Sequence, residues 1–341
     1  MVMKKKVHIT LLIILGLIVT IFAVSQIVKV SIRKGLKEDF EKFTENIMHW
    51  GQTEELEDGV ISYNGTKYRY NEDLVTILCM GVDTSVTRVN MNVPGDNGQA
   101  DAIFLILFDE KDKTVKFINV PRDIVANVQE YDQYGMPYQK IKEQIALQFT
   151  YGDGREKSCE LMKSVVSEVL YGLPINAYVA INMDAIGVLN DQIGGVTVTV
   201  GEDFTLANRA FTQGATITLS GEQAIQYTHT RDTSMMGSNL MRIGRQKQYL
   251  VAYTNTVIPA VKEDVTLPQE MYKAIESYMT TDISVEEVTY LAGQAVKSDI
   301  DIDNIQILPG EYCAGEQYDE YVLDEDAVYE MILENFYTKI K

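Results

Sequence analysis

The sequence has few of the residues on which several kinds of site depend. Its three cysteines (Cys79, Cys159 and Cys313) are widely separated and show no metal-ligand or redox spacing, so neither a disulfide framework nor a zinc site is indicated. Only three histidines occur in 341 residues, which disfavours histidine-rich metal centres. Lysine and arginine total 30 against 49 acidic residues, a net charge of −19. So acidic a chain is not expected to bind nucleic acid.

Long hydrophobic runs are also scarce, and the one that stands out lies at the N-terminus. Residues 9–28 are almost continuously apolar, about the length that a helix needs to cross a bilayer, and Lys4, Lys5 and Lys6 precede them. Basic residues on that side predict a cytoplasmic N-terminus and a main domain outside the membrane. The alternative is a cleaved signal peptide with a weak site at 23–25, but the run is longer than a signal core.

The rest of the chain divides into three expected parts after an anchor over residues 1–30. Polar residues with apolar ones at helical spacing predict a stalk over residues 31–60. An Asn-Gly turn at 64–65 predicts a hairpin and the start of a globular domain over residues 61–258. Residues 259–341 are expected to form a C-terminal extension packed on that domain.

The globular part alternates between strand and helix patterns. Apolar runs ending at Asp83, over residues 102–108 and over residues 115–120 predict three adjacent buried strands. Apolar stripes and end signals predict helices at 140–151, 156–170, 184–193, 220–229 and 239–258, and strands at 177–181 and 196–200. Ser220 and Gln223 form a capping box. The alternation predicts an α/β fold with a mixed central sheet flanked by helices.

Charged residues stand at the ends of the three central strands. Asp83 stands at the end of the first strand, Asp101 stands at the start of the second, and Arg122 and Asp123 follow the third. Such residues are rarely buried unless paired, and ligands of open α/β sheets bind at strand ends, so these positions are candidates for a site. Asp83 and Asp101 are candidate Mg²⁺ ligands. Asp123 is expected either to orient Arg122 or to act as a base.

A second charged group follows residue 227. Arg242 and Arg245 are three apart on one helical face, with Gln246 adjoining and Arg231 upstream. Arginine suits bidentate phosphate recognition, although pairing with surface carboxylates is the alternative. Arginines together with a metal predict phosphoryl chemistry. The chain has no Walker A loop, so a nucleotide donor is not indicated.

On these residues and the motifs around them, the sequence resembles the LytR-CpsA-Psr family of envelope proteins. The resemblance covers about residues 74–253 and keeps the motifs in consistent order. The motifs are GVD (Gly81–Asp83), QAD ending at Asp101, VPRD (Val120–Asp123), YGDG (Tyr151–Gly154), IGGVTVTV (Ile193–Val200), LSGEQAIQY (Leu219–Tyr227) and the run Arg231…Arg242…Arg245-Gln246.

The resemblance implies an α-β-α fold that binds polyprenyl-pyrophosphate lipids among apolar helices. It implies a magnesium-dependent transfer of a glycopolymer phosphate, such as wall teichoic acid or capsule, onto peptidoglycan. By position, Asp83 and Asp101 match the metal-site aspartates and Arg122 matches the arginine closest to the reaction. The residues that match the phosphate side are Arg231, Arg242, Arg245 and, as a polar partner, Gln246.

Three positions depart from the family pattern. His229 stands where an arginine is usual, Asn239 where an aspartate is usual, and Ser85 where an arginine is common. The pocket is therefore expected to be less basic than in other members. Two alternatives to the transferase remain: a non-catalytic protein that binds polyprenyl-phosphate glycans or regulates wall assembly, and a lipid pyrophosphatase that uses water as acceptor. Retention of Asp83, Asp101, Arg122 and Arg231 together favours the transferase.

Overall fold

The structure is a computed structural model that describes most of the chain after residue 53. The described residues are 54–55, 60–83, 97–132, 134, 136–205, 207–230, 238–264, 266–284, 287, 291, 298–300, 305–315 and 319–340. The predicted anchor and stalk lie almost entirely outside these residues, as do Ser85 and Arg231. The side chains of Asn239 and Arg242 are not described either.

A mixed sheet forms the centre of the fold, as predicted. Its strand order is β12-β9-β4-β5-β6-β13, and β14 also pairs with β6. The strands are β4 (Leu74–Val82), β5 (Ala100–Asp109), β6 (Thr114–Asn119), β9 (Ala177–Asn182), β12 (Met279–Thr281), β13 (Asp299–Ile300) and β14 (Gln306–Ile307). β5 and β6 are antiparallel, whereas β13 and β14 run parallel to β6. The three apolar runs are the neighbouring strands β4, β5 and β6, and almost every residue of β4 and β5 is buried.

The described residues fall into two compact units, whose boundary passes through β4 and β9. The sheet unit comprises the described residues up to 79, from 97 to 179 and from 298 onward. The helical unit comprises residues 80–83 and the described part of 180–291. Each unit is described by itself below.

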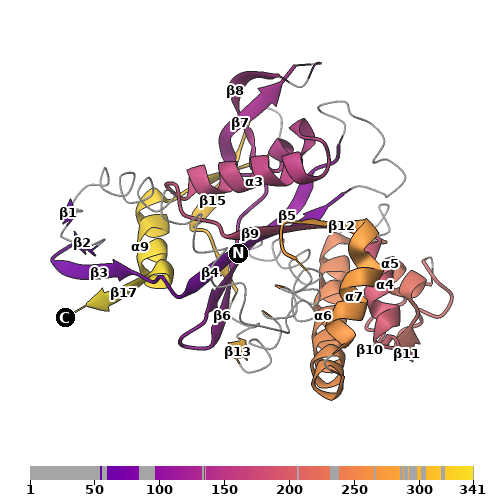
Figure 1. Cartoon of the computed structure of the whole chain (residues 1–341). Helices are drawn as coiled ribbons and strands as arrows, with labels where there is room; N and C mark the ends of the chain where they lie inside the picture. Colours follow the sequence, from indigo (N-terminus) through magenta and orange to yellow (C-terminus); the bar gives the residue numbers. More distant parts are fainter. Residues whose placement is uncertain are drawn as a thin grey trace. The chain divides into compact units, whose positions relative to one another are not determined.

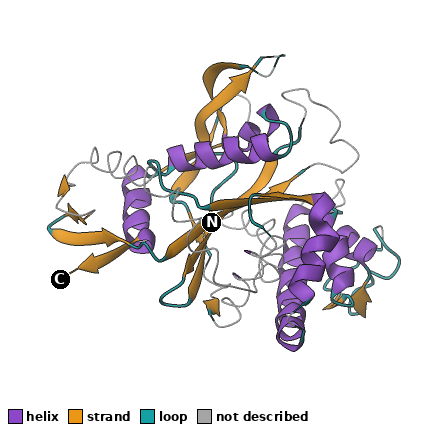
Figure 2. Ribbon diagram, in the orientation of Figure 1, coloured by secondary structure: helices purple, strands orange, loops and turns teal. Residues whose placement is uncertain are grey.

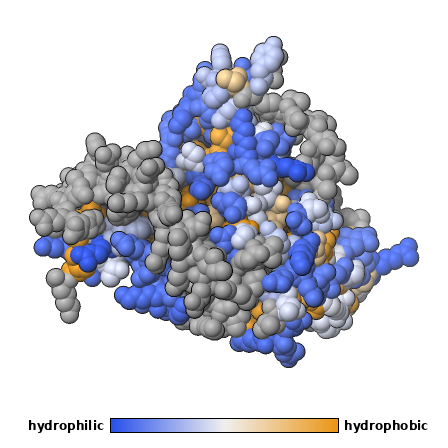
Figure 3. Space-filling view, in the orientation of Figure 1, coloured by the Kyte–Doolittle hydropathy of each residue, from blue (hydrophilic) through white to orange (hydrophobic). Residues whose placement is uncertain are grey.

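In the sheet unit, one long helix and one two-stranded ribbon follow β6. The ribbon consists of β7 (Val125–Tyr131) and β8 (Pro137–Gln144), and it leads through a 3₁₀ helix, η3 (Ile145–Tyr151), into α3 (Glu156–Val169). Figure 1 shows the ribbon extending beyond α3. The outward side of α3 is hydrophilic (Figure 3), whereas Cys159, Met162 and Val166 on its other side are fully buried.

The C-terminal residues complete the sheet unit. Strand β17 (Tyr337–Ile340) closes a small sheet in the order β1-β2-β3-β17, with β1 (Glu54–Glu55), β2 (Val60–Tyr63) and β3 (Thr66–Tyr70). The Asn64-Gly65 turn joins β2 to β3, and both residues have positive φ (50° and 74°), as an Asn-Gly hairpin requires. Helix α9 (Glu325–Phe336) and the hairpin of β15 (Gly310–Ala314) and β16 (Asp319–Leu323) precede β17.

The helical unit is mainly a group of packed helices (Figure 2). They are α4 (Ala185–Gln192), α5 (Gly221–His229), α6 (Ser238–Glu263) and α7 (Leu267–Ile275), accompanied by the hairpin of β10 (Val196–Thr199) and β11 (Thr216–Leu219). Helices α4 and α5 pack so closely that a Cβ on Gly221 would collide with the carbonyl of Gly187. The predicted capping box of Ser220 and Gln223 is present at the start of α5.

Two sequence-based expectations are corrected. Residues 140–151, predicted as a helix, are strand β8 up to Gln144 and then η3. The apolar residues of this segment fit either structure, and pairing with β7 decides in favour of the strand. Helix α6, predicted over residues 239–258, continues through Pro259 to Glu263. Within the described residues, no helix has the length and apolar character needed to cross a bilayer.

Candidate functional site

A cluster of polar side chains surrounds Arg122 in the sheet unit; we call Gln99, Asp101, Arg122, Asp123 and Tyr312 the Arg122 cluster. The guanidinium of Arg122 pairs with Asp101 through Nη1 and donates to Gln99 Oε1 through Nη2 (3.1 Å). Its Nε lies 3.5 Å from Asp123 Oδ1. The side chain of Arg122 is 35% exposed, so an anionic ligand can reach it from solvent.

Strand pairing explains why these residues meet. β5 and β6 are antiparallel, with Phe104 opposite Asn119, so the start of β5 lies beside the end of β6. Asp101 is the second residue of β5, and Arg122 follows β6 by three residues. The prediction that charges at the strand ends converge therefore holds for Asp101, Arg122 and Asp123.

The loop before β5 is fixed by the YGDG segment. Asn97 is buried, its Nδ2 donates to the Gly152 carbonyl (2.8 Å), and its backbone N–H donates to Thr150 Oγ1 (3.3 Å). Gly152 must be glycine, because a Cβ there would collide with Ser158. These contacts hold the segment that carries Gln99 and Asp101.

Tyr312 reaches the cluster from β15, and the sequence analysis did not identify it. Its hydroxyl donates to Asp123 Oδ2 at 3.2 Å. Burial, followed by the nearby Asp123 carboxylate, raises the pKa of Tyr312, so the hydroxyl stays protonated and remains a donor at neutral pH. Nothing in the local sequence of Tyr312 reveals this role, because the contact joins residues 189 positions apart. Gln99 is the first residue of the QAD motif, so its sequence position was a usable signal.

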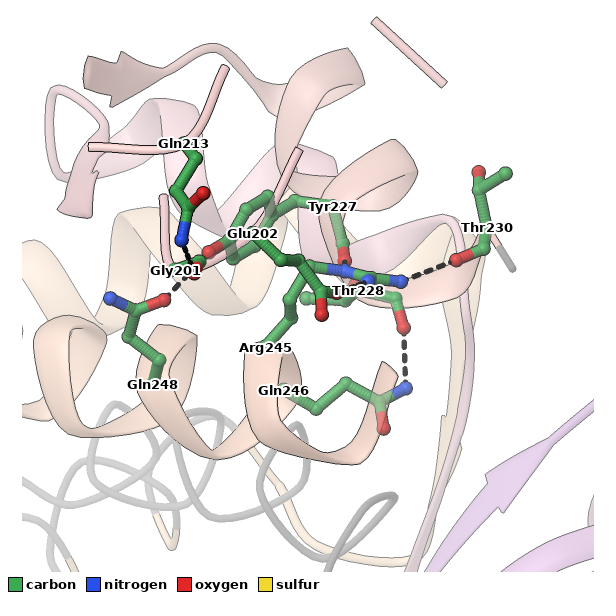
Figure 4. A network of polar contacts seen from close by, with 9 residues as sticks. All are labelled: Gly201, Glu202, Gln213, Tyr227, Thr228, Thr230, Arg245, Gln246 and Gln248. Atoms are coloured by element: carbon green, nitrogen blue, oxygen red, sulfur yellow. Dashed lines mark hydrogen bonds and ion pairs between the residues drawn. The ribbon is translucent and has the colours of Figure 1, made fainter. Parts of the chain in front are cut away.

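A second cluster is centred on Arg245 in the helical unit (Figure 4). Arg245 is only 5% exposed. Its Nε donates to the Tyr227 carbonyl (2.9 Å), its Nη2 donates to the Thr230 carbonyl (2.6 Å), and its Nη1 pairs with Glu202. The guanidinium also stacks on Phe204, with Cζ 3.8 Å from the ring centroid. All three of its nitrogens are therefore engaged within the helical unit.

The same cluster includes Gln246 and perturbed ionisable groups. Gln246 Nε2 donates to the Thr228 carbonyl, while its buried Oε1 accepts no hydrogen bond from the residues that the structure describes. Burial lowers the pKa of Arg245, and the hydrogen bond to Glu202 opposes that shift. Burial raises the pKa of Tyr227 to about 12, so its hydroxyl donates to Gln248 Oε1 (2.6 Å) throughout the physiological range.

The structure thus groups the predicted site residues into two clusters, one in each unit. Asp101, Arg122 and Asp123 lie together in the sheet unit, and Arg245 and Gln246 lie together in the helical unit. Asp83 is exposed just after β4, and His229 is the last residue of α5 and half-buried. Arg231 and the side chains of Asn239 and Arg242 lie outside the described residues.

The donor chemistry of the sheet-unit cluster is compatible with magnesium. Mg²⁺ is usually held by one or two carboxylates together with waters and substrate phosphates, rather than by an all-protein cage. Among the described residues, no group of three or more His, Cys, Asp and Glu side chains is placed to hold a metal. Asp101 supplies carboxylate oxygens of the kind that magnesium prefers, so a site completed by waters and substrate phosphate is consistent with the side chains of this cluster.

The known proteins to which this chain is similar include teichoic acid transferases. The chain is 27% identical over 241 residues to the polyisoprenyl-teichoic acid–peptidoglycan teichoic acid transferase TagU of Oceanobacillus iheyensis, covering 71% of this chain and 63% of that protein. It is 29% identical over 188 residues to TagT of Bacillus subtilis, covering 53% and 52%. The chain thus spans less than two thirds of the length of these relatives.

Solved structures share the fold. Protein gbs0355 of Streptococcus agalactiae matches with a TM-score of 0.56 at 18% identity, over 79% of this chain and 91% of that one. TagT bound to LI-WTA matches with a TM-score of 0.51 at 21% identity, over 77% and 89%. The sequence model of the LytR_cpsA_psr family matches residues 38–335, nearly the whole chain. This chain therefore belongs to the LytR_cpsA_psr family.

Proposed function

We propose that the protein is a membrane-anchored phosphotransferase that moves a glycopolymer phosphate from a polyprenyl-pyrophosphate carrier to peptidoglycan. The observation that carries the proposal is the guanidinium of Arg122, which is partly exposed and held in one orientation by Gln99, Asp101 and Asp123. Relatives named as teichoic acid–peptidoglycan transferases support the same reaction class. The lipid-linked teichoic acid intermediate bound to TagT supports a lipid-linked donor.

The proposed reaction is a phosphoryl transfer. An acceptor hydroxyl of peptidoglycan attacks the phosphorus that carries the glycopolymer, a new P–O bond forms, and the P–O bond to the carrier phosphate breaks. Polyprenyl phosphate leaves, and the hydroxyl proton passes to water. Such a reaction needs positioning and charge stabilisation more than covalent chemistry from the protein. A fixed, partly desolvated arginine supplies both.

Within this proposal, Arg122 neutralises the charge that develops on the transferred phosphoryl group. Of the two roles expected for Asp123, orientation of Arg122 is the one that its contacts favour, because Arg122 and Tyr312 engage its two oxygens. Asp83 and Asp101 are the proposed Mg²⁺ ligands; when bound, the metal polarises the phosphoryl oxygens. The proposed phosphate contacts outside the sheet unit are Arg231, Arg242, His229, Asn239 and Gln246.

Arg245 remains a predicted phosphate contact by family position, but its geometry favours a supporting role. Its guanidinium pairs with Glu202 and binds the carbonyls of Tyr227 and Thr230, at the C-terminal end of α5. A cation there satisfies helix-end carbonyls and complements the helix dipole. Arg245 would thereby place His229 and the residues that follow it.

We further propose that residues 1–30 anchor the protein in the cell membrane and residues 31–60 form a stalk. The residues from 61 to 258 are then the catalytic domain outside the membrane, with 259–341 as its extension. This topology suits a donor with a lipid tail and a peptidoglycan acceptor.

The test is a transfer assay with the full chain in detergent micelles. The protein is incubated with a polyprenyl-pyrophosphate glycan, peptidoglycan fragments and Mg²⁺, and the phosphodiester-linked product is measured by mass spectrometry. We expect product from the wild type, no product with EDTA, and at least a hundredfold lower rate in Arg122→Ala, since removing one transition-state donor costs about 10²–10³ in rate. Arg69→Ala, which removes an exposed arginine of β3, is the matched control and should react at the wild-type rate.

Three results would contradict parts of the proposal. Unchanged transfer in Arg122→Ala would remove Arg122 from the mechanism. Tight lipid binding without product would favour a binding protein, with His229 and Asn239 as the first positions to examine. Release of glycan phosphate without any acceptor would favour a pyrophosphatase.

A further inference from the structure

The β15–β16 hairpin is fixed to the backbone that carries the Arg122 cluster. The Tyr321 N–H donates to the Asp123 carbonyl (2.9 Å), and Tyr321 forms an isolated parallel bridge with Ile124. Gln144 Nε2 donates to the carbonyl of Asp319 (3.1 Å), the first residue of β16. A segment almost 200 residues downstream is therefore placed directly against the residues that follow β6.

Within this hairpin, the Tyr312 side chain is held from behind. Its ring packs edge-on against Tyr321, with the centroids 4.9 Å apart. The Tyr321 hydroxyl proton is shared between the carbonyl oxygens of Leu308 (2.8 Å) and Gly310 (3.1 Å). The Tyr312 hydroxyl then has one described acceptor, Asp123 Oδ2 at 3.2 Å. The two tyrosines of this hairpin thus have different contacts: the Tyr321 hydroxyl stabilises the hairpin, and the Tyr312 hydroxyl contacts the candidate site.

The hydrogen bond from Tyr312 to Asp123 affects the orientation of Arg122, because Asp123 contacts both residues. A carboxylate that faces Arg122 Nε on one oxygen and accepts a phenol hydroxyl on the other is restrained in rotation. Gln99 and Asp101 hold the remaining two nitrogens of Arg122. The plane of the guanidinium is therefore defined on all three sides, and Tyr312 secures the side that Asp123 occupies. Side chains that contact a functional group in this way commonly set the geometry of a site.

We propose that Tyr312 is a positioning residue whose hydroxyl, acting through Asp123, orients Arg122 for phosphoryl transfer. The proposal rests on the proposed function for its effect on rate, but the contact itself can be tested independently. It also assigns a task to the C-terminal hairpin, which the family motifs do not cover.

The kinetic test compares Tyr312→Phe with Tyr321→Phe, two variants that each remove one hydroxyl from the same hairpin. Loss of one oriented hydrogen bond should lower kcat of Tyr312→Phe by about tenfold. We expect an unchanged KM for the lipid-linked donor and an unchanged Tm, because the ring and its packing remain. Tyr321→Phe should show the opposite result, a lower Tm with kcat retained. Equal losses of kcat and Tm in the two variants, or wild-type kcat in Tyr312→Phe, would overturn the proposal.

The second test needs no activity. In protein labelled with ¹³C at tyrosine Cζ, the Tyr312 signal is identified by its loss in Tyr312→Phe. Asp123→Asn should move that signal, and the Tyr321 signal should stay in place. A Tyr312 signal indifferent to Asp123→Asn would refute the contact. If the contact is found in a protein that shows no transfer, the proposed function fails and the structural part of this inference stands.

Discussion

At the scale of single residues, Arg245 shows that the spacing of a charged residue does not reveal what its side chain contacts in the fold. Its spacing from Arg242 indicated a phosphate ligand or a surface ion pair. The structure places it almost fully inside the helical unit, where it pairs with Glu202, stacks on Phe204 and binds the end of α5. No sequence pattern distinguishes an arginine that faces a ligand from one that faces helix-end carbonyls.

Truncating Arg245 should therefore lower stability. Arg245→Ala removes a buried cation and leaves Glu202 and two carbonyls without their donor, which should cost about 3 kcal/mol in the free energy of unfolding. Thermal unfolding monitored by circular dichroism measures the loss. Arg209→Ala, which removes an exposed arginine from the same unit, is the control and should leave Tm within about a degree. Equal Tm values for the two variants would contradict the structural role of Arg245.

A second prediction at this scale concerns how the stability of the protein depends on pH through Glu168. Burial alone would raise the pKa of Glu168 on α3, but hydrogen bonds from Lys140 (2.7 Å) and Asn127 (2.9 Å) outweigh it and hold that pKa below its ordinary value. A lowered folded-state pKa contributes stability that is present above the ordinary glutamate pKa, about 4.3, and is lost as pH falls through the lowered value.

Glu168→Gln should therefore lower Tm at neutral pH, and the difference from wild type should shrink as the pH falls below about 4. Tm measured from pH 7 to pH 3 gives the profile. Glu160→Gln, at an exposed position of the same helix, provides the comparison. A difference that stays constant across the whole range would show that Glu168 does not titrate in this way.

At the scale of elements, predictions from the sequence succeeded where local signals are strong. The apolar runs correctly predicted β4, β5 and β6, and the apolar stripe in residues 156–170 correctly predicted α3. The capping box located the start of α5. The prediction for residues 140–151 failed because the apolar residues of this segment fit either a helix or a strand, and pairing with β7 makes its first part a strand.

The candidate site, like the fold, was predictable where its residues lie next to strong local patterns. Asp101, Arg122 and Asp123 stand beside long buried strands, so their positions follow from the strand ends. Tyr312 and Glu202 lie in segments with weak patterns, and their roles depend on contacts formed only in the folded chain. Pairings of this kind carry no periodic signal that a single sequence could reveal.

At the scale of the whole molecule, the two ends of the described chain meet in one small sheet. β17 pairs with β3 from Tyr337 opposite Tyr70 to Ile340 opposite Lys67. Tyr337 is buried against Tyr70, with their ring centroids 5.6 Å apart. The last strand is therefore part of the structural core of the sheet unit.

Ending the chain after Phe336 should consequently destabilise the sheet unit. The deletion exposes the edge of β3 and removes a buried tyrosine, which alone is worth about 2 kcal/mol. We expect a clearly lower Tm and faster proteolysis than in the wild type. Ending the chain after Ile340, which removes only Lys341, is the control. A deletion variant as stable as this control would contradict the pairing of β17 with β3.

The late position of Tyr312 has a consequence for how the protein is made. A chain emerging from the ribosome can pair β5 with β6, and so bring Arg122 to Asp101, nearly 200 residues before Tyr312 appears. Domains generally begin to fold from the N-terminal side during synthesis. Arg122 would then stay incompletely oriented until translation has passed the β15–β16 hairpin. A nascent or prematurely terminated chain should therefore carry the motif residues without their final geometry, which links activity to completion of the polypeptide.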